Sequence, residues 1–266
     1  MLTTLKNVFK IKELRNKILF TLGMLVVIRF GSQLPVPGIR IDEFVNWFQQ
    51  KVGAADSSGF LSAITGGSFE NMSILALNIT PYITSSIIMQ LLTIAIPKLE
   101  EMQKDGEDGR KKIAAITRYV TVGLALIESI AMAVGFGRQG LLEEYNFVNC
   151  AIVVCTLTAG SAFLMWIGER ITEKGVGNGI SIVLTINIIS RIPQDLGTLW
   201  SQVIVNKSIP KAIVAALIIC AIIVAMVVFV VFLQDAERRM LKNQRNLFLR
   251  GKKRRLPKRS RSLKKQ

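Results

Sequence analysis

The chain has 266 residues, half of them hydrophobic, and a mean hydropathy of +0.42, which is typical of a protein with several membrane-spanning helices. Its net charge of +16 comes mostly from one end, because residues 238–266 hold 14 Lys and Arg and no acidic residue. Histidine is absent, which excludes Ser-His nucleophiles, His-ligated zinc sites and histidine proton relays. We therefore expect a nearly neutral membrane domain with a basic tail, no catalytic site, no metal ion and no cofactor.

Six apolar segments are predicted to be membrane-spanning helices. In chain order they cover about residues 18–34, 72–96, 113–134, 150–167, 179–192 and 212–233. Lys and Arg gather before the first segment and between the second and the third, whereas the loops expected on the opposite side carry few. Because cytoplasmic loops are enriched in Lys and Arg, both termini are expected to be cytoplasmic.

The second segment contains a proline where an uninterrupted helix would be expected. Residues 75–96 are uncharged, but Pro81 lies among them and removes a helical hydrogen bond that lipid cannot replace. Such a break is tolerated where a helix lines a cavity or packs against protein, so it indicates part of a pathway; a kinked helix in a bundle is the alternative. Ile79, Ile83 and Ile87 recur every four residues and would share one helix face, although such a stripe more often faces lipid or a neighbouring helix.

Several shorter features have more than one interpretation. Residues 59–71 are too short and glycine-rich to span, and their composition favours an external loop over a re-entrant segment. Residues 175–181 resemble a phosphate-binding loop only superficially, and we predict a tight cytoplasmic turn in which the glycines and Asn178 permit positive φ. Glu128 is an ionisable group within the third segment, for which a functional role and a position near the interface both stay open. Arg29 is interpreted as an interfacial anchor.

Five stretches, in matching order and spacing, resemble the SecY family, the central subunit of the bacterial protein-conducting channel. They are RFGSQLPVPGI (29–39), GGSFENMSILALNITPYITSSIIMQLL (66–92), EDGRKKIAAITRY (107–119), MWIGERITEKGVGNGISI (165–182) and FVVFLQDAERR (229–239). The resemblance covers about residues 8–239 and implies an all-α membrane protein, equivalent to the first six of the ten transmembrane helices of a SecY-like channel. Such channels consist of two halves related by an inverted repeat. Residues 240–266 would follow as a basic, low-complexity, disordered cytoplasmic tail.

The resemblance also implies functional residues. The ring of apolar side chains that narrows the pore corresponds, by motif position, to Ile79, Ile83, Ile180 and Leu184. Residues 59–71 correspond to the short helix that plugs the pore from outside, which reverses the preference for a plain loop. The plug residues are Gly59, Phe60, Leu61, Ile64, Gly66 and Gly67. Arg238 and Arg239 begin a cytoplasmic loop that helps dock the ribosome or the motor ATPase SecA, although adjacent arginines at a helix end serve equally well as membrane-interface anchors.

The function implied by the resemblance is that of a pore-forming subunit that passes secretory polypeptides across, and membrane proteins into, the bacterial plasma membrane. The implied partners are SecE, SecG, SecA, the ribosome, signal sequences, the translocating polypeptide and anionic lipid. Because the resemblance is expected to end at Arg239, residues 240–266 are interpreted as the product of a truncated or frameshifted reading frame. The alternative function is a nonconducting fragment or membrane scaffold that contacts ribosomes and anionic lipid. A small-solute transporter is disfavoured, because the segments lack paired charges around a substrate site.

Overall fold

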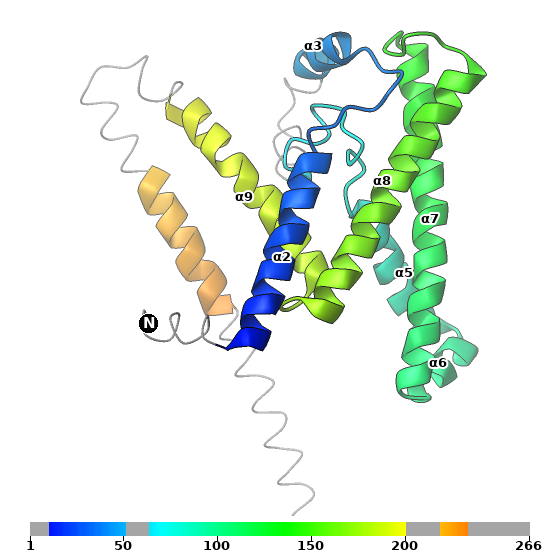
Figure 1. Ribbon diagram of the computed structural model, residues 1–266, viewed down its shortest axis with the longest axis vertical. Coiled ribbons are helices and arrows are strands. Elements are labelled where there is room, and N and C mark those ends of the chain that lie inside the picture. Colours follow the sequence, from blue (N-terminus) through cyan, green and yellow to red (C-terminus); the bar gives the residue numbers. More distant parts are fainter. Residues whose placement is uncertain (1–10, 52–63, 201–218, 234–266) are drawn as a thin grey trace, which may run out of the picture. The chain divides into compact units, whose positions relative to one another are not determined.

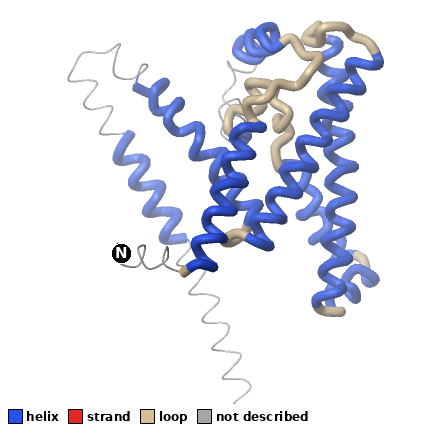
Figure 2. Tube along the Cα trace, viewed as in Figure 1, coloured by secondary structure: helices blue, strands red, loops and turns tan. Residues whose placement is uncertain are grey.

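A computed structural model describes residues 11–51, 64–200 and 219–233. Within these residues the chain is helical and has no strand, only isolated bridges that pair Pro35 with Ser73 and Ile39 with Leu142 (Figure 2). The chain divides into two units, Met1–Pro193 and Gln194–Gln266, and the description below concerns the first unless stated otherwise. The expected all-helical fold is confirmed for the described residues.

Seven helices are described in the first part of the chain. They are α2 (Lys12–Gly31), α3 (Ile41–Lys51), α5 (Thr80–Ala95), α6 (Pro97–Lys104), α7 (Glu107–Arg138), α8 (Phe147–Lys174) and α9 (Gly179–Trp200). Helices α7 and α8 run side by side (Figure 1), α5 packs against α7, and α2 packs against α8. The second unit contains a further apolar helix, Ile219–Leu233.

By length and composition, 2 helices of the described chain, α7 and α8, can each cross a membrane. Helices α5 and α6 count as a third span only if they are taken together, because the chain bends by 100° between them. Helix α2 is long enough, but its first turns carry Lys12, Glu13, Arg15 and Lys17. The predicted number of six spans therefore remains a prediction, although a helix is present in each of the six predicted segments.

The second predicted segment is not a single helix interrupted at Pro81, as was expected. Residues 66–79 form consecutive turns, and α5 begins only at Thr80, with Pro81 in its first turn. Proline is accommodated there without loss of a hydrogen bond, because the first N–H groups of a helix have no intrahelical partner. The interruption thus precedes Pro81. The 16 residues of α5 extend only about 24 Å at 1.5 Å per residue.

The irregular segment 66–79 is paired through its backbone to the chain that follows α2. The N–H of Val36 donates to the carbonyl of Met72 at 3.0 Å, and the N–H of Ile74 donates to the carbonyl of Leu34 at 2.8 Å. Helix α8 approaches the segment closely at Gly160, where a Cβ atom would lie 2.0 Å from the carbonyl oxygen of Ile74. Non-helical backbone at membrane depth needs such protein partners, since lipid supplies none.

Helix α3 was not predicted from the sequence. Its Phe44 and Phe48, four residues apart, are both buried. The Phe44 ring packs edge-on against Phe136 of α7 with 5.2 Å between ring centroids, and the Phe48 ring packs against Phe69 with a 5.7 Å separation. This aromatic cluster fixes the start of the irregular segment against α3 and α7, since buried aromatic pairs stabilise beyond the area they bury.

Candidate functional site

The four residues predicted to form the pore ring lie in one apolar cluster where α2, α5, α8 and α9 meet. Ile79 precedes α5 and is fully buried, and Ile83 follows it one turn into that helix. Ile180 and Leu184 belong to the first turns of α9 and pack against the same cluster. The fold therefore brings together two pairs of residues that are far apart in the sequence.

Glycine in α8 permits this convergence. A Cβ atom at Gly168 would lie 2.5 Å from Cδ1 of Ile180 and 3.5 Å from Cδ1 of Ile79. A Cβ atom at Gly179, the first residue of α9, would lie 1.9 Å from the carbonyl oxygen of Gly168. The start of α9 therefore packs directly on the backbone of α8, at a distance that only glycine allows.

The four ring candidates are not equivalent in this arrangement. The side chain of Ile79 is 0% exposed, so it packs inside the cluster and lines no open surface. Ile83 and Ile180, by contrast, line a cavity of about 770 Å³. Leu184 packs against the cluster without lining that cavity. Ile83 and Ile180 are thus the two candidates that line this cavity.

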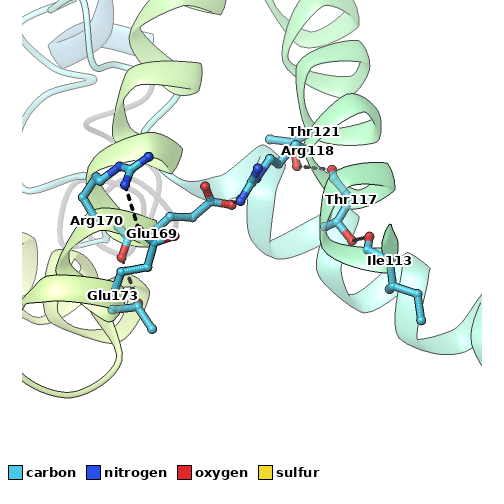
Figure 3. Close-up of polar contacts among 9 residues, drawn as sticks. Ile113, Thr117, Arg118, Thr121, Glu169, Arg170 and Glu173 are labelled. Atoms are coloured by element: carbon cyan, nitrogen blue, oxygen red, sulfur yellow. Dashed lines mark hydrogen bonds and ion pairs between the residues drawn. The ribbon is translucent and has the colours of Figure 1, made fainter. Parts of the chain in front are cut away.

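The cavity has an apolar part and a charged part. Its walls come from α5, α7, the end of α8, the turn before α9 and the first turn of α9. In the charged part, Nε of Arg118 on α7 donates to Oε1 of Glu169 on α8 at 2.7 Å, as Figure 3 shows. Arg170, the next residue of α8, forms an ion pair with Glu173 at 2.8 Å, one turn further along the same helix (Figure 3). The described residues contain no group of three or more Cys, Asp or Glu side chains able to hold a metal ion.

The predicted turn between α8 and α9 is present, with a different division of roles. Gly177 takes the positive φ, +71°, whereas Asn178 caps α9, because its Oδ1 accepts a hydrogen bond from the N–H of Ile180 at 3.0 Å. Thr21 of α2 accepts another from the N–H of Val176 at 3.2 Å. The turn is therefore fixed to α2 at one end and to α9 at the other.

Substitution of the cap should weaken the start of α9. We expect Asn178→Ala to lower helix stability there by about 1 kcal/mol, while Asn178→Ser retains most of it, because a serine hydroxyl caps nearly as well. Amide hydrogen exchange at Ile180 and Ser181, followed by mass spectrometry, measures this difference. Equal protection in the two variants would contradict the capping role.

Only part of the predicted plug lies within the described residues. Gly59, Phe60 and Leu61 lie outside them, as do Arg238 and Arg239 of the predicted docking loop. Ile64 is partly buried, and Gly66 and Gly67 follow with φ of +62° and +81°. A Cβ atom at Gly66 would lie 2.8 Å from the carbonyl oxygen of Asn187, so this part of the chain packs directly on α9.

Sequence reasoning missed a polar cluster beside the apolar one. Arg29, interpreted above as an interfacial anchor, donates a hydrogen bond to Asn187 of α9, and Arg191 one turn later pairs with Glu70. The signal that could have revealed it is an Asn and an Arg four residues apart on an otherwise apolar helix. Glu128 lies elsewhere, in the wall of a cavity of about 320 Å³.

Comparison with known proteins shows extensive similarity. The family model described as SecY matches residues 73–260, which extends past Arg239, where the resemblance was expected to end. The protein translocase subunit SecY of Halalkalibacterium halodurans is 42% identical over 245 residues, covering 90% of this chain and 56% of the relative. The SecY subunit of Bacillus subtilis is 40% identical over 246 residues, again covering 90% and 56%. The chain therefore spans about half the length of the curated relatives it matches.

Two similar solved structures are described as Sec61 in the canine ribosome-channel complex from the endoplasmic reticulum and as the structure of a protein-conducting channel. Each has a TM-score of 0.46 at 19% sequence identity and covers 71% of this chain and 38% of its own.

Proposed function

We propose, since the chain belongs to the SecY family, that it forms one wall of a pore through which polypeptides cross a membrane. The chain is a multi-pass membrane protein, as the family and its apolar helices indicate. The proposal places it in the bacterial plasma membrane with six spans and both termini in the cytoplasm. Secretory polypeptides would cross through the pore and membrane proteins would leave it sideways into lipid. Its partners would be SecE, SecG, SecA, the ribosome, signal sequences and anionic lipid.

The observation that carries this proposal is the gathering of Ile79, Ile83, Ile180 and Leu184 in one apolar cluster beside a cavity. A constriction of apolar side chains gives ions and water poor partners, so it can dewet and resist leakage. The same side chains accept many different polypeptide side chains, because they demand no particular hydrogen bond. Ile83 and Ile180 would face the passage, with Ile79 and Leu184 supporting them from behind.

The irregular segment before α5 supports the same function. Transport proteins build their pathways from helices interrupted at membrane depth, where the free backbone groups lie against protein or a cavity. Here α5 starts at Thr80, directly after Ile79. The ring candidates therefore lie where the chain changes from turns to helix, at a point supported by α8 through Gly160 and Gly168.

Site-specific photocrosslinking tests the proposal. A photoreactive amino acid would replace Ile83 or Ile180, and the chain would be produced together with the remaining part of the Bacillus subtilis relative. Membrane vesicles would then receive a secretory precursor arrested during translocation. We expect crosslinks from both positions, because both line the cavity. The matched control is Ile94, which lies on the same helix as Ile83 and is 82% exposed.

Crosslinks from Ile83 and Ile180 that exceed those from Ile94 would support a passage at this site. Equal or absent crosslinks would contradict it and would favour the alternative of a nonconducting scaffold. The accumulation of uncrosslinked precursor, measured in the same vesicles, shows that the substrate was engaged.

A further inference from the structure

A groove between α7 and α8 takes no part in the passage proposed above. Its volume is about 580 Å³, and it lies where the loop 139–146 connects the two helices. Ile130 and Val134 belong to its wall on α7, and its wall on α8 extends from Phe147 to Cys155. Most of the lining side chains are apolar. Cavities of this size and character hold small, largely apolar ligands.

The groove has the position and the length to receive a lipid chain. Both α7 and α8 can cross a membrane, and apolar side chains at its edges are exposed, among them Ile127 and Phe147, which is 89% exposed. At a rise of about 1.5 Å per residue, the wall from Phe147 to Cys155 is about 12 Å long. The hydrocarbon of one leaflet is about 15 Å thick, half of the bilayer core. Most of one acyl chain therefore fits along the groove.

The mouth of the groove has the features of a membrane interface. A Cβ atom at Gly137 would lie 2.1 Å from Cε2 of Tyr145, so the tyrosine ring packs directly on the end of α7. Tyrosine is enriched at the boundary between lipid and water, where its ring contacts apolar groups and its hydroxyl stays hydrated. Because Tyr145 lines the groove, its mouth lies at headgroup level and its apolar part lies deeper.

Two opposite charges lie at this mouth. Arg138 follows Val134 by one turn on the same face of α7. Glu144 precedes Tyr145, and its Oε2 accepts a hydrogen bond at 2.8 Å from Nδ2 of Asn146, which lines the groove. In the part of the chain that the structure describes, neither Arg138 nor Glu144 forms an ion pair. Both charges are therefore available to a ligand.

The two charges distinguish between membrane lipids. A guanidinium group binds phosphate oxygens, and a carboxylate binds an ammonium group. Phosphatidylethanolamine carries a phosphate and an ammonium group in one headgroup, whereas phosphatidylglycerol carries the phosphate without a cation. The other carboxylate of the loop, that of Glu143, lies in a residue whose carbonyl accepts from Nη2 of Arg40 at 3.0 Å, so a second cation lies beside it. Glu144 thus favours the zwitterionic lipid.

We propose that the groove between α7 and α8 binds one acyl chain of phosphatidylethanolamine, with Arg138 holding the phosphate of the headgroup and Glu144 its ammonium group. In the topology proposed above, this lipid belongs to the outer leaflet. The inference goes beyond the proposed function, since it requires only that α7 and α8 cross a membrane. The bound chain would fill the space that these two helices leave open at this end.

Photolabelling of the full-length chain tests the site. The chain would be inserted in vesicles of phosphatidylcholine with a trace of phosphatidylethanolamine that carries a diazirine in one acyl chain. After irradiation, mass spectrometry maps the label. We expect more label between Phe147 and Cys155 than at Leu91 and Ile94, exposed residues of α5 that contact bulk lipid. Unlabelled phosphatidylethanolamine should displace the label about tenfold more effectively than phosphatidylglycerol, because a hydrogen bond between charged groups has this effect.

Three variants separate the headgroup contacts from the groove itself. Glu144→Gln removes the charge but keeps an oxygen for Asn146, and the two unlabelled lipids should then displace the label equally. Arg138→Gln should lower the labelling about tenfold, since both lipids lose the phosphate contact. Ala151→Phe fills the groove, where Ala151 is part of the wall, and should abolish the excess label. The control is Lys112→Gln near the other end of α7, which should label like the parent.

Label in the groove that does not exceed the label on α5 would show contact with bulk lipid only and would overturn the proposal. Equal displacement by the two lipids in the parent, or a preference that survives Glu144→Gln, would overturn it as well. The measurement involves no translocation. A failed crosslinking experiment with a positive lipid result would therefore remove the proposed function and leave the lipid site standing.

Discussion

Gly160→Ala is expected to destabilise the helical unit by about 3 kcal/mol, because overpacking a close contact costs this much when the neighbour cannot move aside. The neighbour is backbone: the new Cβ atom would lie 2.0 Å from the carbonyl oxygen of Ile74 and 2.9 Å from its carbon. Helix α8 or the segment 66–79 would have to shift. Because that segment leads directly into Ile79, the displacement should also disturb the apolar cluster.

The matched control is Gly123→Ala on α7, where nothing lies within 4 Å of the position of the added Cβ atom. Alanine there should be neutral or stabilising by up to about 1 kcal/mol, since it has the higher helix propensity. Unfolding in mixed micelles, titrated with sodium dodecyl sulfate and followed by tryptophan fluorescence, measures both variants. If the two variants unfold at the same detergent fraction, the close approach of α8 to the irregular segment is wrong.

The helices themselves were largely predictable, because apolar composition marks the part of a helix that lies in lipid. The predicted segment 113–134 lies inside α7 and 150–167 lies inside α8, and in both cases the helix extends further at each end. The longer extension of each helix is polar: α7 begins with Glu107 and Asp108, and α8 ends with Glu173 and Lys174. Hydropathy cannot detect a helix where it leaves the apolar layer, so the ends were underestimated.

Proline has opposite effects in the middle of a helix and in its first turn, and the sequence alone did not show which of the two positions Pro81 occupies. Pro81 removes a hydrogen bond in the middle of a helix but suits its first turn. In the structure Pro81 lies in the first turn, because α5 starts at Thr80. The residues that decide this are Gly160 and the backbone partners Leu34 and Val36, which stabilise turns before Pro81 and lie far from it in the sequence.

The ring candidates came from a resemblance, and the structure adds what the resemblance could not. It places all four in one cluster, but it also distinguishes Ile83 and Ile180, which line the cavity, from Ile79, which is enclosed. That difference depends on Gly168, whose missing side chain leaves room for Ile180. The polar cluster of Asn187 and Arg191 was missed for the same reason, because the partners of these two residues are set by tertiary packing.

Asparagine in place of Ile83 or Ile180 is expected to raise the ion conductance of an assembled channel on the order of tenfold, which corresponds to a barrier lower by about 1.4 kcal/mol. An amide side chain offers water and ions the hydrogen-bond partners that an apolar constriction denies them. The channel would combine this chain with the remaining part of the Bacillus subtilis relative, and single-channel recording in planar bilayers would measure the leak without any polypeptide substrate.

The cavity predicts an order among the ring candidates. Substitution of Ile83 and Ile180 should raise the leak more than substitution of Leu184 by asparagine, because only the first two line the open cavity. Ile83→Leu keeps the site apolar and should leave the conductance unchanged, and Ile94→Asn on the exposed face of α5 should do the same. Ile79→Gly tests the supporting role proposed for Ile79. This substitution would leave a void behind Ile83 and Ile180 and would place no polar group in the passage. A leak that stays at the parental level with asparagine at both Ile83 and Ile180 would remove this cluster from the pore.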